Sequence, residues 1–335
     1  MRLLVALPLL LAALPAAAAD PWLAFPGGDG PGKGKHVVLV SGDEEYRSEE
    51  ALPMLAQVLS VRHGFRTTVL FAIDPADGKV QPNVKDNIPG LDTLASADLL
   101  VLFTRMRKLP DAQMKHIVDY VEAGKPVVGL RTATHAFETS GDAYGKYGWT
   151  AKVPGYEGGF GKQVLGETWV AHHGQHGKQG TRGVAPPDRA PTPLWNGIKP
   201  GDIFGPSDVY TVNLPLPGDA VPVVLGEVTE TLDPKSKAVA GKKNDPMMPV
   251  AWTRTYTGSG GKAGRVFATT MGASQDLAYE GTRRLVVNAC FWALGLDVPA
   301  KADVTPVGAY HPTPFRFKKD MEWKPGKTPA EYAGK

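Results

Sequence analysis

Residues 126–135 read PVVGLRTATH, a short apolar run that leads through an arginine into a polar turn. Such a run is typical of a strand that is buried on both faces of a parallel sheet. Residues 110–124, just before it, carry apolar side chains at helical spacing, with Pro110 suited to the first turn and Gly124 to the end. The sequence therefore predicts a helix that crosses over into a buried parallel strand.

The same alternation continues toward the N-terminus. Residues 36–41 (HVVLVS), 67–72 and 98–104 are further predicted strands. A helix with Ser48 as its N-cap and Pro53 in an irregular first turn is predicted after the first of them. Strand and helix in this rhythm predict a doubly wound α/β fold with a mainly parallel sheet and right-handed crossovers.

The second half of the chain predicts an extension of this sheet. Apolar runs at 221–228, 250–256 and 265–270 are expected to add strands with antiparallel pairing, and residues 258–261 to turn between the last two. A buried helix is expected at 282–294, with the single cysteine, Cys290, acting there as a small apolar side chain. Residues 138–190 are rich in glycine and are expected to form long loops around a short helix near 160–170.

The N-terminus resembles a secretory signal. Arg2 precedes a run rich in leucine and alanine, and Ala19 ends a stretch of small residues suited to cleavage before Asp20. The run is too short for a spanning helix, and no lipidated cysteine follows it, so we expect a periplasmic or secreted protein without membrane insertion. Cleavage removes Arg2 and no acid, so the formal net charge falls from +3 to +2. The basic residues are dispersed, which argues against nucleic-acid binding.

The chain is expected to hold one large domain. After the signal at residues 1–19, the predicted parts are a lead-in at 20–35, the α/β domain at 36–296 and a proline-rich tail at 297–335 that wraps the surface. The sequence does not predict an oligomeric state.

Polar side chains follow three of the predicted strands at their carboxyl ends, where ligands bind in open parallel sheets. His135 is the candidate general base, and Asp43 or Glu44 the assisting acid or orienting group. The alternative for His135 is a structural role, in which a histidine in the first turn of a helix forms a hydrogen bond with a carbonyl. Six further residues are candidates for binding substrate: Arg131, Arg105, Arg47, Tyr46, Thr132 and Trp169.

Arg131 follows its strand where a nucleophile elbow would expose one side chain. Arginine stays protonated and cannot act as a nucleophile or base, so the turn would clamp an anion or polar ligand. The alternative is a structural arginine, paired with Asp43 or a nearby acid.

Residues 172–176 read HHGQH, and His172, His173 and His176 are candidate ligands of a divalent transition metal such as zinc. A solvent-exposed loop without metal is the alternative. Trp149, Tyr156 and Trp169 lie in the same region and suit either sugar binding or loop packing.

Five segments together resemble the ThuA-like family, which is named for trehalose utilisation: SGDEEYRSEE at 41–50, GLRTATHAF at 129–137, PVAWTR at 249–254, GRVF at 264–267 and NACFWALG at 288–295. The family is similar in fold to class I glutamine amidotransferases, which implies a flavodoxin-like sheet. Those enzymes carry a catalytic cysteine where this sequence has Arg131, so glutaminase chemistry by a thiolate is excluded.

The resemblance implies a carbohydrate as the small-molecule partner. The first hypothesis is therefore an exported enzyme, a hydrolase, lyase or isomerase, that acts on a sugar or an oxidised sugar derivative by acid–base chemistry, with a metal as an optional participant. The second is a protein on the same fold that binds a carbohydrate or a partner without catalysis.

Overall fold

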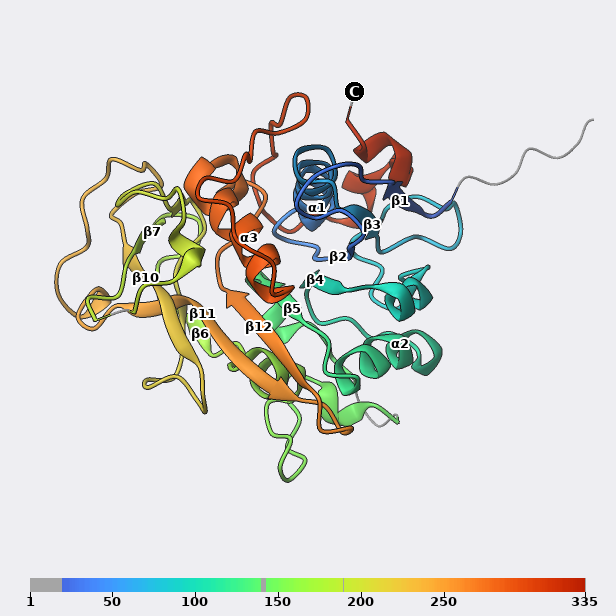
Figure 1. Cartoon of the computed structure of the whole chain (residues 1–335), viewed down its shortest axis with the longest axis horizontal. Helices are drawn as coiled ribbons and strands as arrows, with labels where there is room; N and C mark the ends of the chain where they lie inside the picture. The colour runs from blue at the N-terminus through green and yellow to red at the C-terminus, as the bar shows by residue number, and fades with distance from the viewer. Residues whose placement is uncertain (1–19, 140–142, 189, 335) are drawn as a thin grey trace, which may run out of the picture.

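The computed structural model describes residues 20–139, 143–188 and 190–334, so the predicted signal peptide at 1–19 lies outside the described residues. A ten-stranded mixed sheet runs through the molecule in the order β1-β3-β2-β4-β5-β12-β11-β10-β7-β8 (Figure 1). Its strands are β1 (Trp22–Phe25), β2 (His36–Gly42), β3 (Arg66–Leu70), β4 (Leu99–Thr104), β5 (Val127–Leu130), β7 (Thr181–Val184), β8 (Phe204–Gly205), β10 (Val221–Val228), β11 (Met248–Thr257) and β12 (Ala263–Thr269). A separate pair joins β6 (Ala171–His172) to β9 (Tyr210–Thr211).

Five neighbouring strands, β3, β2, β4, β5 and β12, run parallel and form the centre of the sheet. The prediction of a mainly parallel sheet is confirmed. The prediction of antiparallel pairing is right for β10 and β11 and incomplete for β12, which pairs antiparallel with β11 but parallel with β5. The hairpin through residues 258–261 reverses the chain, and this reversal gives β12 the direction of the central strands.

Three helices cover the two faces of the sheet. Side chains alternate along β2, so Val37 and Leu39 pack on one face with α1 (Ser48–Gln57) and α3 (Glu280–Ala293). Val38 and Val40 pack on the opposite face with α2 (Asp111–Glu122). Figure 1 shows α1 and α3 on the side opposite α2, which is the doubly wound arrangement.

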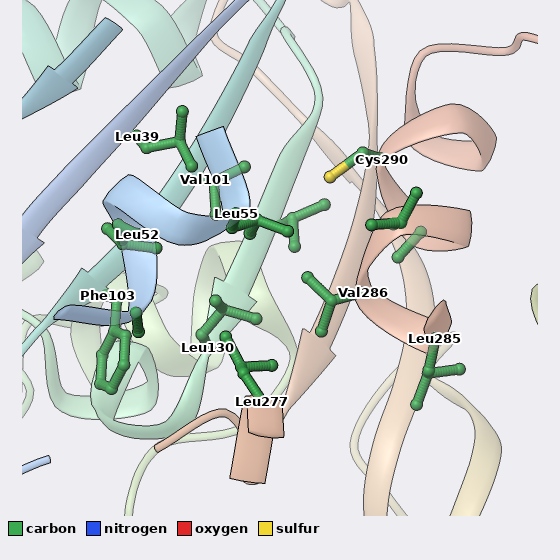
Figure 2. Packing of buried hydrophobic residues seen from close by; sticks show 14 of the residues in the cluster. Leu39, Leu52, Leu55, Val101, Phe103, Leu130, Leu277, Leu285, Val286 and Cys290 are labelled. Carbon is green, nitrogen blue, oxygen red and sulfur yellow. The ribbon is translucent and has the colours of Figure 1, made fainter. Parts of the chain in front are cut away.

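The core under α1 and α3 is built mainly from apolar side chains. Leu52 and Leu55 of α1 meet Val101 and Phe103 of β4, and Val286 of α3 closes the layer (Figure 2). Cys290 lies in α3 as predicted, and burial raises the pKa of its thiol to about 12. The thiol is therefore protonated and inert at neutral pH, as expected for a packing residue.

The start of α1 differs from the prediction. Arg47, with a φ of 60°, is the N-cap residue, and Ser48 is already the first helical residue. The Ser48 hydroxyl accepts a hydrogen bond of 3.0 Å from the amide of Asp43 and lies 2.8 Å from the hydroxyl of Ser41. Ser48 thus fastens the β2–α1 loop, which carries several candidate site residues.

The two terminal segments both pack on the domain, and the end of the tail lies beside β1 (Figure 1). The lead-in supplies β1, which pairs antiparallel with β3 at one edge of the sheet. Over its described residues, 297–334, the tail forms two short 3₁₀ helices, at Asp320–Trp323 and Pro329–Tyr332. Its backbone bonds to the β2–α1 loop, where the amide of Arg316 donates to the carbonyl of Glu45 at 3.0 Å.

None of the helices in the described residues is long and apolar enough to cross a bilayer.

Candidate functional site

The carboxyl ends of β2, β4 and β5 meet a histidine loop at residues 171–176 and a second loop at residues 206–210. The three predicted groups of residues, after β2, β4 and β5, do come together here: Arg105 contacts Glu44, and Thr132 contacts Asp43. What each side chain contacts differs from the predictions in several cases.

Arg131 is a buried structural residue at the centre of this edge, with no exposed surface. Its Nη1 donates to the carbonyls of Asp208 at 2.7 Å and Thr270 at 2.6 Å, and its Nη2 donates to Asp208 Oδ1 at 2.7 Å. The guanidinium carbon lies 4.4 Å from the ring centroid of Tyr46 and 3.7 Å from that of Tyr210. The predicted ligand clamp is therefore wrong, because these contacts enclose the guanidinium. The alternative of a pair with an acid is right, with Asp208 in place of Asp43.

The backbone of Arg131 is strained. Its φ of 45° lies in the left-handed region, which costs a non-glycine residue about 1 kcal/mol or more. This sharp turn resembles the geometry expected of an elbow, but it turns the side chain inward toward Asp208.

Asp208 connects Arg131 to two histidines. Its Oδ1 lies 3.2 Å from His176 Nδ1, and its Oδ2 lies 2.7 Å from His172 Nδ1. Burial would raise the pKa of Asp208, but the charge of Arg131 and the hydrogen bonds from both histidines outweigh burial and hold the pKa well below its usual range. Asp208 is therefore a carboxylate at any ordinary pH.

The histidine loop separates its three histidines into two groups. The side chains of His172 and His176 are 40% and 37% exposed and share Asp208. His176 also places its Nε2 3.2 Å from Glu45 Oε1, and hydrogen bonds to Asp208 and Glu45 raise its pKa to about 9. His173 instead binds the carbonyl of Lys243 through Nε2 at 2.8 Å. Of the three predicted ligands, the structure brings two together and sets His173 apart.

His135 lies next to this centre, within a group of aromatic rings. Its ring centroid lies 5.6 Å from that of Trp169, and 6.2 Å from those of Trp149 and Tyr210. Burial, followed by the positive charge of Arg105, holds the pKa of His135 well below its usual range. The ring is therefore neutral at neutral pH, and only 3% of the residue is exposed.

Asp43 organises the β2–α1 loop. Its Oδ1 accepts hydrogen bonds from the amides of Glu45 at 2.7 Å and Tyr46 at 2.6 Å, and its Oδ2 accepts one from the hydroxyl of Thr132 at 2.5 Å. Burial and the nearby charge of Glu44 raise the pKa of Asp43 to about 6. The prediction left open whether Asp43 assists as an acid or as an orienting group. Both of its oxygens and Thr132 are engaged within the protein, so Asp43 positions the loop.

Glu44 is held by basic side chains. It pairs with Arg105 Nη1 at 2.6 Å, with Lys85 at 3.6 Å and with the fully buried Arg107. Arg105 keeps part of its surface exposed and lies with its guanidinium carbon 5.0 Å from the ring centroid of Phe317 in the tail. Of the arginines predicted to bind substrate, Arg105 alone retains access to solvent, and Glu44 serves to hold it.

Arg47 binds the tail, in contrast to the substrate contact predicted for it. It is fully buried, and its Nη2 donates to the carbonyl of Arg316. Its Nη1 lies 3.5 Å from Glu49, and its guanidinium carbon lies 4.7 Å from the ring centroid of Trp323. The predicted substrate-binding Tyr46 is likewise buried beneath the site, where its hydroxyl accepts from Arg131.

The three aromatic residues predicted to bind sugar or to pack loops lie in two separate places. Trp149 and Trp169 lie 6.0 Å apart, and Trp169 lies 5.9 Å from His172, so both belong to the site. Both are partly exposed. Tyr156 packs against Tyr147 with a centroid distance of 5.0 Å and belongs to a different part of the loop region.

Two central residues were absent from the sequence predictions. Asp208 lies in the loop just before the two-residue strand β9, and Tyr210 is the first residue of that strand, which is too short to show any periodicity. Asp208 reaches Arg131 across a sequence separation of 77 residues. No local pattern identifies such a contact.

Comparisons with known proteins identify one family. The family model for trehalose utilisation, ThuA, matches residues 36–293. Among solved structures, a ThuA-like protein from Parabacteroides merdae is 16% identical, with a TM-score of 0.48 over 86% of this chain and 99% of that chain. A ThuA-like protein from Bacteroides uniformis is 14% identical, with a TM-score of 0.47 over 84% of this chain and 95% of that chain. No curated protein matches the sequence.

Proposed function

Because this chain belongs to the ThuA (trehalose utilisation) family, we propose that it is an exported enzyme that acts on a sugar or an oxidised sugar derivative at the carboxyl edge of its sheet. The observation that carries this proposal is a pair of half-exposed histidines, His172 and His176, that share one buried carboxylate beside two tryptophans. Polar groups beside aromatic faces suit a sugar, which presents apolar C–H faces and hydroxyl edges.

The proposed roles follow from burial and charge. Trp149 and Trp169 contact the face of the sugar ring. His172 and His176 contact the oxygen on which negative charge develops, since stabilising such charge is a large contribution to catalysis. His135 is neutral and lies among the same rings, so it is the group that accepts the proton. Asp208 and Arg131 hold the two exposed histidines in position.

The experiment is a product analysis on a panel of trehalose, other glucosides and their chemically oxidised derivatives. Mass spectrometry detects a change of mass or of retention time. His172→Gln and His135→Gln should each lose about 100-fold or more in turnover, the range for loss of an acid–base group. His173→Gln is the matched control, because it lies in the same loop but binds Lys243, and it should stay within about twofold of the wild type.

A different outcome would favour a protein that binds without catalysis. In that case a sugar of the panel binds, depends on Trp169 for its affinity and is recovered unchanged after long incubation. Equal losses in His172→Gln and His173→Gln would count against the assignment of the site.

The proposal of export rests on residues 1–19, with cleavage after Ala19. Since β1 begins at Trp22, such cleavage removes no residue of the sheet. N-terminal sequencing of the protein from a periplasmic or culture fraction should give Asp20 as the first residue. A protein that keeps Met1 and stays with the cytoplasmic fraction would contradict this part of the proposal.

A further inference from the structure

We propose that His172, His176 and Asp208 bind one divalent transition metal, such as zinc, at the site described above. One nitrogen of each histidine and one carboxylate oxygen of Asp208 lie within 4.8 Å of one another. Two imidazoles and a carboxylate are a common ligand set for catalytic zinc. The inference deepens the proposed function, on which it rests for the role of the metal.

The donor atoms converge from two separate segments. His172 Nδ1 and His176 Nδ1 lie 2.7 Å and 3.2 Å from the two different oxygens of Asp208. Once each Nδ1 has lost its proton, these two imidazole nitrogens and one carboxylate oxygen present lone pairs to the same space. A cation there would satisfy all three at once, as it does in metal sites where the ligands are deprotonated.

The surroundings resemble the outer shell of a metal site. A histidine that binds a metal through one ring nitrogen usually donates its other N–H to a carboxylate. His176 has this arrangement, because its Nδ1 faces Asp208 while its Nε2 lies 3.2 Å from Glu45 Oε1. Ligand carboxylates are themselves held by hydrogen bonds, and Asp208 Oδ1 accepts one from Arg131.

Two carboxylates lie beside the histidine pair. Asp208 and Glu45 each contact at least one of the two histidines. Arg131 pairs with Asp208 from the buried side, where its guanidinium is enclosed by Tyr46 and Tyr210, and Arg105 Nε lies 3.7 Å from Glu45 Oε2. The exposed side of the cluster is formed by the two histidines, which carry charge only when protonated.

Three protein ligands leave at least one coordination position open, which is the pattern of catalytic sites and not of closed structural ones. Trp169 lies beside His172, with 5.9 Å between ring centroids, so a sugar stacked on Trp169 brings its oxygens toward that open position. The ligand proposed for the open position is therefore a hydroxyl or carbonyl oxygen of the sugar.

The first measurement is the metal content of the mature protein, produced without a histidine tag, incubated with zinc and dialysed. Elemental analysis by mass spectrometry should find about one zinc ion per chain. His172→Ala, at an exposed position that should not disturb folding, should abolish this zinc. His173→Ala should retain it, because His173 binds the carbonyl of Lys243.

Zinc titration by calorimetry then ranks the variants. Glu45→Gln should weaken zinc binding about 10- to 100-fold, as expected for an outer-shell partner, and His172→Ala and Asp208→Asn should weaken it more. Circular dichroism establishes that each variant is folded. If Asp208→Asn fails to fold, His172→Ala carries the test alone.

The inference is overturned if the wild type retains less than about a tenth of an equivalent of zinc, manganese, cobalt and nickel, each tried separately. It is also overturned if His173→Ala loses as much zinc as His172→Ala. Metal content is measured without any sugar, so the two proposals can fail separately. Sugar turnover by a metal-free protein that depends on His172 would support the proposed function and contradict the metal site. Stoichiometric zinc without sugar turnover would support the metal site and contradict the proposed function.

Discussion

Replacing Arg131 by methionine tests whether this arginine holds the site together or binds a ligand. The substitution keeps a long side chain but removes the charge and all donors. Asp208 then loses its buried partner, and both side chains of this pair have no exposed surface. Breaking a buried ion pair by removing one partner costs about 3–5 kcal/mol, so we expect Arg131→Met to lower the free energy of unfolding by about 4 kcal/mol.

Urea denaturation followed by tryptophan fluorescence measures this loss, in the presence of a chelator so that metal does not contribute. A lower midpoint with an unchanged slope indicates a change in stability rather than in the denatured state. Arg105→Met is the control. Glu44 keeps Arg107 when Arg105 is lost, and Arg105 is partly exposed, so we expect a loss of about 1 kcal/mol or less.

Arg131→Met and Arg105→Met should therefore differ several-fold in their effects on stability. This expectation is refuted if each variant lowers the free energy of unfolding by about 1 kcal/mol or less and Arg131→Met abolishes sugar binding instead. Arg131 would then be a ligand clamp, and its buried pair with Asp208 would not be a main support of the site.

Three further outcomes follow from single residues. Burial raises the pKa of Glu49 from 4.5 to about 7, so the stability of the wild type falls as the pH rises through this interval. At pH 8, Glu49→Gln should therefore have a free energy of unfolding up to about 3 kcal/mol higher than the wild type, as measured by urea denaturation. Near pH 4 the two proteins should have the same free energy of unfolding. A difference that does not change with pH would contradict this cause. Trp169→Ala should weaken sugar binding by calorimetry about tenfold, while Tyr156→Ala, which lies outside the site, should not change it. The ring centroid of Phe315, in the tail, lies 5.5 Å from that of His176. Phe315→Ala should therefore lower the free energy of unfolding by about 1–2 kcal/mol and speed the chemical modification of His176 by an imidazole-specific reagent. No change in either measurement would show that the tail does not shield this histidine.

The parallel centre of the fold could be predicted because buried parallel strands are continuous apolar runs. Residues 36–41 and 98–104 are such runs, and both are strands in the structure. The pairing of β12 with β5 could not be predicted in the same way, because strand order depends on contacts between distant segments. β1 was missed because its four residues follow no strand pattern and lie beside a stretch rich in glycine and proline.

The edge of the sheet at which these side chains gather was predictable, and the direction of each side chain was not. The rule that ligands bind at strand carboxyl ends selected His135 and Arg131 correctly as members of this edge. The inward direction of Arg131 follows from a backbone with φ of 45°, which no sequence pattern specifies. His172 and His173 separate because neighbouring residues of an extended segment point to opposite sides.

Turnover of the sugar panel by zinc-loaded wild type and His172→Ala, followed by mass spectrometry, tests the central claim most directly. That claim is that His172, His176 and Asp208 form the reacting centre of a sugar enzyme. The account predicts a new product from at least one trehalose-like or oxidised sugar with the wild type, and a loss of about 100-fold or more with His172→Ala. Product formation at equal rates by both proteins would contradict it.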